Sequence, residues 1–205
     1  MYIPPKLQLE LAQACELIRR EPFAVMFSAE GGLEASHLPL IISECGTRLY
    51  GHMARANPQW QSIDGQSVLA VFSGPHAYIS PAWYAKGPAV PTWNYTAVHV
   101  TGQLKLIEGE QAISCLMDTV NRFEPTLLDS GLMPGEYVEK LSSAIVAFEV
   151  VIEKIEGKAK LGQQRKLEDQ QGVVAGLEAS GHKDAQALLT EMSHLQLGTG
   201  VVEPK

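Results

Sequence analysis

Between residues 90 and 99 the chain reads Val90-Pro91-Thr92-Trp93-Asn94-Tyr95-Thr96-Ala97-Val98-His99. Aromatic and β-branched residues continue this pattern from Trp93 to Ile107, and only Gly102 interrupts it. Residues of these two kinds favour extended backbone because their side chains pack well on a pleated surface. The stretch therefore predicts one long β-strand, which begins among polar and aromatic side chains.

Shorter runs on both sides of this strand predict the rest of a sheet. Strands are expected over residues 23–28, 33–42, 47–53, 67–72, 77–80 and 145–155, separated by Gly-rich turns and by the break Gly74-Pro75. Helical spacing of apolar residues predicts helices over 7–20, 110–123 and 134–141, with brief helices after Asn57-Pro58 and Ser80-Pro81. Residues 156–172 are polar, and a weak helix with a Gly-containing tail is expected over 173–205.

The order of these elements indicates the fold class. The strands are short and closely spaced, and the helices are inserted between them without the regular alternation of a doubly wound sheet. The predicted class is mainly β with flanking helices (α+β), built around an antiparallel barrel. With 205 residues the chain is expected to form one domain. The sequence lacks the GxGxxG and phosphate-loop motifs, so the dinucleotide and ATP chemistry of the folds that carry them is disfavoured.

Composition and charge limit where the protein is expected to be located and which partners it is expected to bind. Hydrophobic residues make up 45% of the chain and charged residues 19%, as in a globular protein. No apolar run could span a bilayer and residues 1–10 lack a secretion signal, so no membrane association and a cytoplasmic location are expected. The net charge of −7 opposes contact with phosphate backbones, so DNA binding would need a local basic patch. The widely spaced Cys15, Cys45 and Cys115 are expected to be buried thiols.

Three segments concentrate polar and aromatic side chains: 51–58, 74–84 and 90–99. Such side chains need partners when they are buried, so the segments are expected to line a site. Arg55 directly precedes a helix start at Asn57-Pro58, so a guanidinium and free backbone N–H groups could converge on a phosphate. The residues alone leave an equal alternative, in which Arg55 forms a surface ion pair and Asn57 only caps its helix.

Other side chains in these segments also leave interpretations open. The histidines lie on separate elements without the local pairing typical of metal ligands, so hydrogen bonding beside a cofactor is preferred to a metal site. They are His52, His76 and His99. The large aromatics either stack on a planar ring or pack in a core or a dimer interface. They are Trp83, Tyr84, Trp93 and Tyr95.

A fourth segment, residues 158–166, contains four basic residues and no acid. A solvated loop is the preferred interpretation of such a run. Contact with a phosphate or with a DNA backbone is the alternative.

Six motifs follow one another along the chain: Met1-Tyr2-Ile3-Pro4-Pro5, His37-Leu38-Pro39-Leu40, residues 51–58, residues 74–84, Val90-Pro91-Thr92-Trp93-Asn94-Tyr95 with His99, and Lys160-Leu161-Gly162-Gln163. In order and spacing they resemble the PaiB family of FMN-binding negative transcriptional regulators. The resemblance implies an FMN-binding split-barrel domain over residues 1–166, akin to pyridoxamine-phosphate oxidases, with 167–205 as a C-terminal helical extension of the same domain. It also implies a homodimer that binds flavin mononucleotide (FMN) across its interface.

Carried over by position, the resemblance implies roles for individual residues. His52 and Met53 would lie along the flavin, and Arg55 and Asn57 would meet its phosphate. His76 is added to the cofactor-binding residues on the preference for a histidine that hydrogen-bonds beside a cofactor. Thr92, Trp93 and Asn94 would line the pocket from the partner subunit, and Lys160, Gln163 and Arg165 would close it. The chain departs from the family pattern at Leu7, where an aromatic is usual, and at Gly162-Gln163-Gln164, where Ser-Gln-Asn is usual.

Two functions follow as hypotheses. The resemblance favours a dimeric flavoprotein that acts as a negative transcriptional regulator. The alternative is a flavin-dependent oxidoreductase acting on a small substrate, for which the sequence identifies no catalytic acid or base. Direct DNA binding has only residues 158–166 in its favour, because no helix-turn-helix pattern is present.

Overall fold

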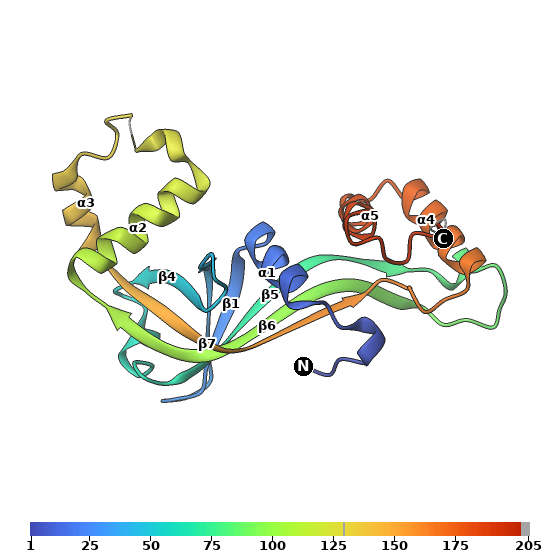
Figure 1. Cartoon of the computed structure of the whole chain (residues 1–205), viewed down its shortest axis with the longest axis horizontal. Coiled ribbons are helices and arrows are strands. Elements are labelled where there is room, and N and C mark those ends of the chain that lie inside the picture. Colours follow the sequence, from blue (N-terminus) through green and yellow to red (C-terminus); the bar gives the residue numbers. More distant parts are fainter. Residues whose placement is uncertain (129, 202–205) are drawn as a thin grey trace. The chain divides into compact units, whose positions relative to one another are not determined.

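The described strands form one sheet in the order β2-β1-β5-β6-β7-β4-β3 (Figure 1). The computed structural model describes residues 1–128 and 130–201. Its strands are β1 (Phe23–Ser28), β2 (Glu34–Pro39), β3 (Ile41–Ile42), β4 (Arg48–Ala54), β5 (Ser67–Ile79), β6 (Thr92–Ile107) and β7 (Ile145–Lys160). The ladders β1–β2, β1–β5, β3–β4 and β4–β7 are antiparallel. The expectation of an antiparallel sheet is confirmed.

Helices occupy the connections between strands and the C-terminal region. The longer ones are α1 (Leu11–Arg20), α2 (Gly109–Phe123), α3 (Gly135–Ser142), α4 (Leu167–Ala179) and α5 (Lys183–Leu195). Short 3-10 helices are η1 (Pro5–Leu7), η2 (Pro58–Gln61), η3 (Pro81–Trp83) and η4 (Pro125–Leu127). One weak helix was expected over 173–205, but two are present, and α4 begins six residues earlier, within the segment 156–172 that was expected only to be polar. Residues 202–205 lie outside the described part.

The contacts divide the chain into two units. Unit 1 comprises Met1–Glu10, Ser73–Ala97 and the described part of Gly157–Lys205, and unit 2 comprises Leu11–Phe72 and Val98–Glu156. The long strands β5, β6 and β7 each contribute residues to both units.

Unit 2 has its core on the sheet, where Met26, Met53, Phe72 and Phe148 are buried. Gly102 interrupts the pattern of strand-favouring residues in β6, and packing explains why it is glycine. A Cβ at Gly102 would lie 2.2 Å from Val151 O, so only glycine lets β6 approach the β7 backbone this closely.

Unit 1 packs α4 and α5 against each other and buries Ile79, Leu161, Leu177 and Leu188. α4 also rests on η3 through two glycines. A Cβ at Gly172 would lie 2.0 Å from Trp83 O, and one at Gly176 would lie 2.3 Å from the Trp83 ring. The two glycines therefore provide the surface on which Trp83 lies.

Three local predictions were wrong for tertiary reasons. β5 continues through the expected break at Gly74-Pro75, beyond the last residue that pairs with β1, where proline is tolerated at an unpaired edge. β7 continues to Lys160, so residues 158–160 are strand and not a solvated loop. Cys45 is exposed in the β3–β4 turn, whereas Cys15 and Cys115 are buried as expected.

Candidate functional site

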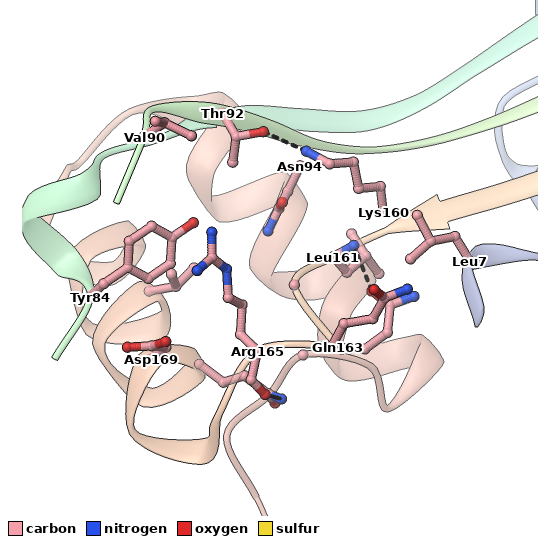
Figure 2. Close-up of a pocket in the computed structure, with 15 residues that line it drawn as sticks. Leu7, Tyr84, Val90, Thr92, Asn94, Lys160, Leu161, Gln163, Arg165 and Asp169 are labelled. Carbon is pink, nitrogen blue, oxygen red and sulfur yellow. Dashed lines mark hydrogen bonds between the residues drawn. The ribbon is translucent and has the colours of Figure 1, made fainter. Parts of the chain in front are cut away.

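Unit 1 contains a cavity of about 430 Å³ between the ends of β6 and β7 and helix α4 (Figure 2). This volume lies in the range of about 300–1,000 Å³ that is usual for cofactor and ligand sites. Five residues predicted from the sequence line it: Thr92, Asn94, Lys160, Gln163 and Arg165. Tyr84, Asp169, Gln170 and Gly198 are among the other residues of its wall.

Lys160 is the last residue of β7 and is held against β6. Its Nζ donates hydrogen bonds to Thr92 Oγ1 and to Trp93 O. Burial lowers the pKa of Lys160 first, and repulsion from Lys158 and Arg165 lowers it further. Lys160 and Arg165 thus place two cations in the cavity wall beside Asp169, the one acid among the described lining residues, and an anionic ligand would offset the repulsion between the cations.

Arg165 stands over an aromatic ring at the cavity wall. Its guanidinium carbon lies 4.4 Å from the centre of the Tyr84 ring, which is a cation–π contact. The nearby carboxylate of Asp169 accepts a hydrogen bond of 3.0 Å from Ala85 N. Arg165 thus keeps its planar fork of donors available at the cavity.

Gln163 and Gly162 form the turn that follows β7. Gln163 Oε1 accepts from Leu161 N at 2.9 Å, and its Nε2 donates to Ala159 O at 2.7 Å. Gly162 has φ +82°, a conformation that glycine adopts without strain. Gln163 therefore lines the cavity while bracing the turn, and glycine suits the conformation at position 162.

Asn94 is 3% exposed and lies on β6, and Figure 2 shows its side chain pointing into the cavity. Its carboxamide has no hydrogen-bond partner among the described residues. It differs in this from Gln163, whose carboxamide is fully engaged.

Two predicted residues of unit 1 lie elsewhere. Trp93 lines a second, more apolar cavity of about 300 Å³ together with Tyr78 and Trp83. The ring of His76 is 6.1 Å from that of Trp93, and His76 Nδ1 lies 3.1 Å from Gly74 O. His76 therefore contacts Trp93 and lines neither of these two cavities.

The predicted phosphate residues belong to unit 2. Arg55 Nε donates to Ser143 O and its Nη2 donates to Ile145 O, both at 2.8 Å, so two of its five N–H donors hold the start of β7. Asn57 Oδ1 accepts from Gln59 N at 3.0 Å, which confirms that Asn57 caps the short helix η2. The structure shows backbone hydrogen bonds where the alternative interpretation expected a surface ion pair for Arg55.

The remaining predicted residues of unit 2 lie on β4. Met53 is buried, and His52 Nδ1 is buried without a hydrogen-bond partner among the described residues. Burial lowers the pKa of His52, so the neutral ring is favoured. Within residues 1–128 and 130–201, no three His, Cys, Asp or Glu side chains gather to hold a metal ion. None of the described helices is long and apolar enough to cross a membrane.

Sequence reasoning missed part of the cavity wall. Gln170 and Gly198 come from α4 and from the segment after α5, and no local motif marked them. The available signal was the start of a helix directly after the basic segment, which places its first turn beside Arg165.

Comparison with known proteins adds the family. Residues 1–154 match the family described as "Putative FMN-binding domain". The protease synthase and sporulation protein PAI 2 of Bacillus subtilis (strain 168) is 33% identical over 198 residues, which cover 92% of this chain and 94% of that protein.

Two solved structures resemble the fold. The flavocytochrome Anf3 from Azotobacter vinelandii superposes with a TM-score of 0.57 at 16% identity, over 77% of this chain and 72% of that one. The FAD and heme binding protein from Mycobacterium smegmatis gives a TM-score of 0.56 at 16% identity, over 75% and 73%. The expected split-barrel class is confirmed. Because the family match spans residues 1–154 and the Bacillus relative covers nearly the whole chain, the protein belongs to the PaiB-like family of FMN-binding domains.

Proposed function

We propose that the chain binds FMN in the unit 1 cavity and acts as a flavin-dependent negative regulator of transcription. One observation carries the proposal: Lys160, Arg165 and Asn94 converge on a cavity of about 430 Å³ beside Tyr84. Two cations, an unpaired carboxamide and an aromatic ring match an anionic, planar, hydrogen-bonding ligand. Bound FMN would supply redox chemistry, and these residues would bind and orient it.

Positive charge is the main contribution of this chain to binding. Lys160 has a third N–H donor beyond the two used for Thr92 and Trp93, and Arg165 contacts only the Tyr84 ring among the interactions described above. Both can therefore reach a ligand without breaking a structural hydrogen bond.

A fluorescence titration with FMN tests the site. Arg165→Gln should weaken FMN binding by about 10-fold, which corresponds to the loss of one charge-assisted hydrogen bond. Lys166→Gln removes the same charge from the adjacent exposed residue, which does not line the cavity, and should leave the affinity unchanged. Equal affinities for all three proteins would refute the cavity as the FMN site.

We also propose a homodimer in which His52, Met53, Arg55 and Asn57 of unit 2 reach the flavin, as the PaiB resemblance implies. Support comes from the large exposed apolar side chains Phe23, Tyr78 and Trp93, which a partner subunit could cover. Sedimentation should then give twice the mass of the chain. In addition, Arg55→Ala should weaken FMN but not riboflavin, which lacks the phosphate; equal loss for both ligands would contradict a phosphate contact.

The basic segment 158–166 presents only part of its positive charge on the surface. Lys158 is 9% exposed and donates to Tyr2 O at 3.1 Å, so the basic segment offers DNA mainly Arg165 and Lys166. A gel shift with the promoter region of a target gene tests direct contact, and Lys166→Gln should weaken any such complex. The three free thiols agree with a proposed cytoplasmic location, where thiols stay reduced.

A further inference from the structure

Most polar side chains that line the unit 1 cavity already have partners within the protein. Gln163 braces its own turn, and Lys160 is bound to β6. Gln170 Nε2 donates to Arg165 O at 2.8 Å, and Gly200 N donates to Gln170 Oε1 at 3.2 Å. These side chains shape the cavity, and their hydrogen-bonding capacity is largely used.

Asn94 is the exception among the buried polar residues of this wall. Its side chain is enclosed in the protein and directed into the cavity, with two N–H donors and one carbonyl acceptor lacking partners among the described residues. Among the described residues, the fully buried side-chain nitrogen and oxygen atoms without a hydrogen-bond partner are His52 Nδ1 and Thr96 Oγ1, so the amide atoms of Asn94 stay open to the cavity. Asn94 can therefore pair with a ligand in the cavity without giving up a hydrogen bond within the protein.

The surroundings of Asn94 hold its carboxamide in place. β6 lies between β5 and β7 in the sheet, so Asn94 belongs to an inner strand. A Cβ at Gly162 would lie 3.5 Å from Asn94 Nδ2, which places the β7 turn directly against the amide. An amide fixed in this way is suited to select among ligands.

The chemistry of the amide indicates which part of the ligand it meets. A phosphate only accepts hydrogen bonds, so it would leave Asn94 Oδ1 unpaired. A ligand edge that carries an N–H beside a carbonyl satisfies both ends of the carboxamide. The flavin ring has such an edge on its dioxopyrimidine, where one N–H lies between two carbonyls.

We propose that Asn94 is a specificity-determining residue whose carboxamide pairs with the dioxopyrimidine edge of FMN. Asn94 Oδ1 accepts from the ring N–H, and Nδ2 donates to a ring carbonyl. The inference rests on the proposed FMN site and assigns to Asn94 the choice of ring, separate from the recognition of negative charge by Lys160 and Arg165.

The affinities of the wild-type protein and of Asn94→Leu for FMN and for a methylated FMN test the pairing. Asn94→Leu keeps the side-chain size and removes both hydrogen bonds, so FMN should bind about 10- to 100-fold more weakly. FMN methylated at the ring N–H should bind the wild-type protein about 10-fold more weakly than FMN does. In Asn94→Leu the two flavins should bind equally, because the methyl group and the mutation remove the same interaction.

Thr96→Val is the matched control. Thr96 lies two residues further on the same face of β6, is 2% exposed and does not line the cavity. Its substitution should leave FMN affinity unchanged; a loss equal to that of Asn94→Leu would overturn the proposal. Additive effects of methylation and Asn94→Leu would overturn it as well, while FMN binding itself would stand. Failure of the wild-type protein to bind FMN would instead refute the proposed function together with this inference.

Discussion

Thr96 and Asn94 share one face of β6 because side chains alternate along a strand. Both are buried and polar, yet Thr96 Oγ1 has no hydrogen-bond partner among the described residues, and Thr96 does not line the unit 1 cavity. The hydroxyl of Thr96 is therefore a local cost to stability that the cavity does not explain.

Thr96→Val should stabilise the protein. Valine has nearly the shape of threonine and removes an unpaired buried hydroxyl, so the free energy of unfolding should rise by about 1 kcal/mol. Urea denaturation of the two proteins measures the difference. A decrease in stability would show that the hydroxyl has a partner, such as an ordered water, that the valine variant lacks.

Cys45 is expected to be the reactive thiol of the chain. Hydrogen bonds from Ser43 first, and then from Thr47, lower the pKa of this exposed thiol to about 7. The rate of iodoacetamide labelling at Cys45 should therefore be half-maximal near pH 7, and Ser43→Ala should move that midpoint upward. Burial raises the pKa of Cys115 to about 11, so Cys115 serves as the internal control and should stay unlabelled over this pH range.

Among the elements, α4 depends on close contact with η3. Gly176→Ala would place a methyl group 2.3 Å from the Trp83 ring, so the helix would have to shift. The expected loss is about 1–3 kcal/mol of unfolding free energy, which exceeds the gain in helix propensity of about 1 kcal/mol.

Gly135→Ala is the matched control for this substitution. Gly135 is the first residue of α3, and nothing lies within 4 Å of an added Cβ there. Its stability should be unchanged or slightly higher. Thermal denaturation of both variants measures the contrast, and an equal loss in the two would mean that contact with Trp83 is not the cause.

Local patterns predicted those elements whose residues carry their own signal. β1 was predicted at its observed bounds, and β6 to within one residue. The predictions failed at Gly74-Pro75 and after Glu156, where the chain reads locally as a turn or a polar loop. In both places distant parts of the sheet provide the pairing, which a local pattern does not contain.

For the molecule as a whole, the resemblance identified much of the cavity wall but not the part that comes from the chain after residue 166. Two segments that the sequence showed to be unusual, 90–99 and 158–166, provide Thr92, Asn94, Lys160, Gln163 and Arg165. The helices after residue 166 carry no comparable motif, so their contribution depended on tertiary packing. The arrangement of the predicted unit 2 residues around the flavin stays a prediction.

Ligand binding should raise the stability of the whole protein. With free FMN at 100 times its dissociation constant, the free energy of unfolding should increase by about 2.7 kcal/mol. Thermal denaturation with and without FMN measures this rise. Arg165→Gln should show a smaller rise at the same FMN concentration, and Lys166→Gln should match the wild-type protein. A rise that is the same for all three would place the ligand away from Arg165.

The cavity draws its wall from Leu7, from Tyr84 to Asn94 and from Lys160 to Gly198. Ten of the fifteen described residues that line the cavity therefore lie at or after Lys160, near the end of the chain. A ribosome must release this final stretch before the nascent protein can enclose a ligand. Under the proposed function, flavin loading follows synthesis of the whole chain, and a cell that produces the protein faster than it supplies FMN would accumulate a fully synthesised but empty form.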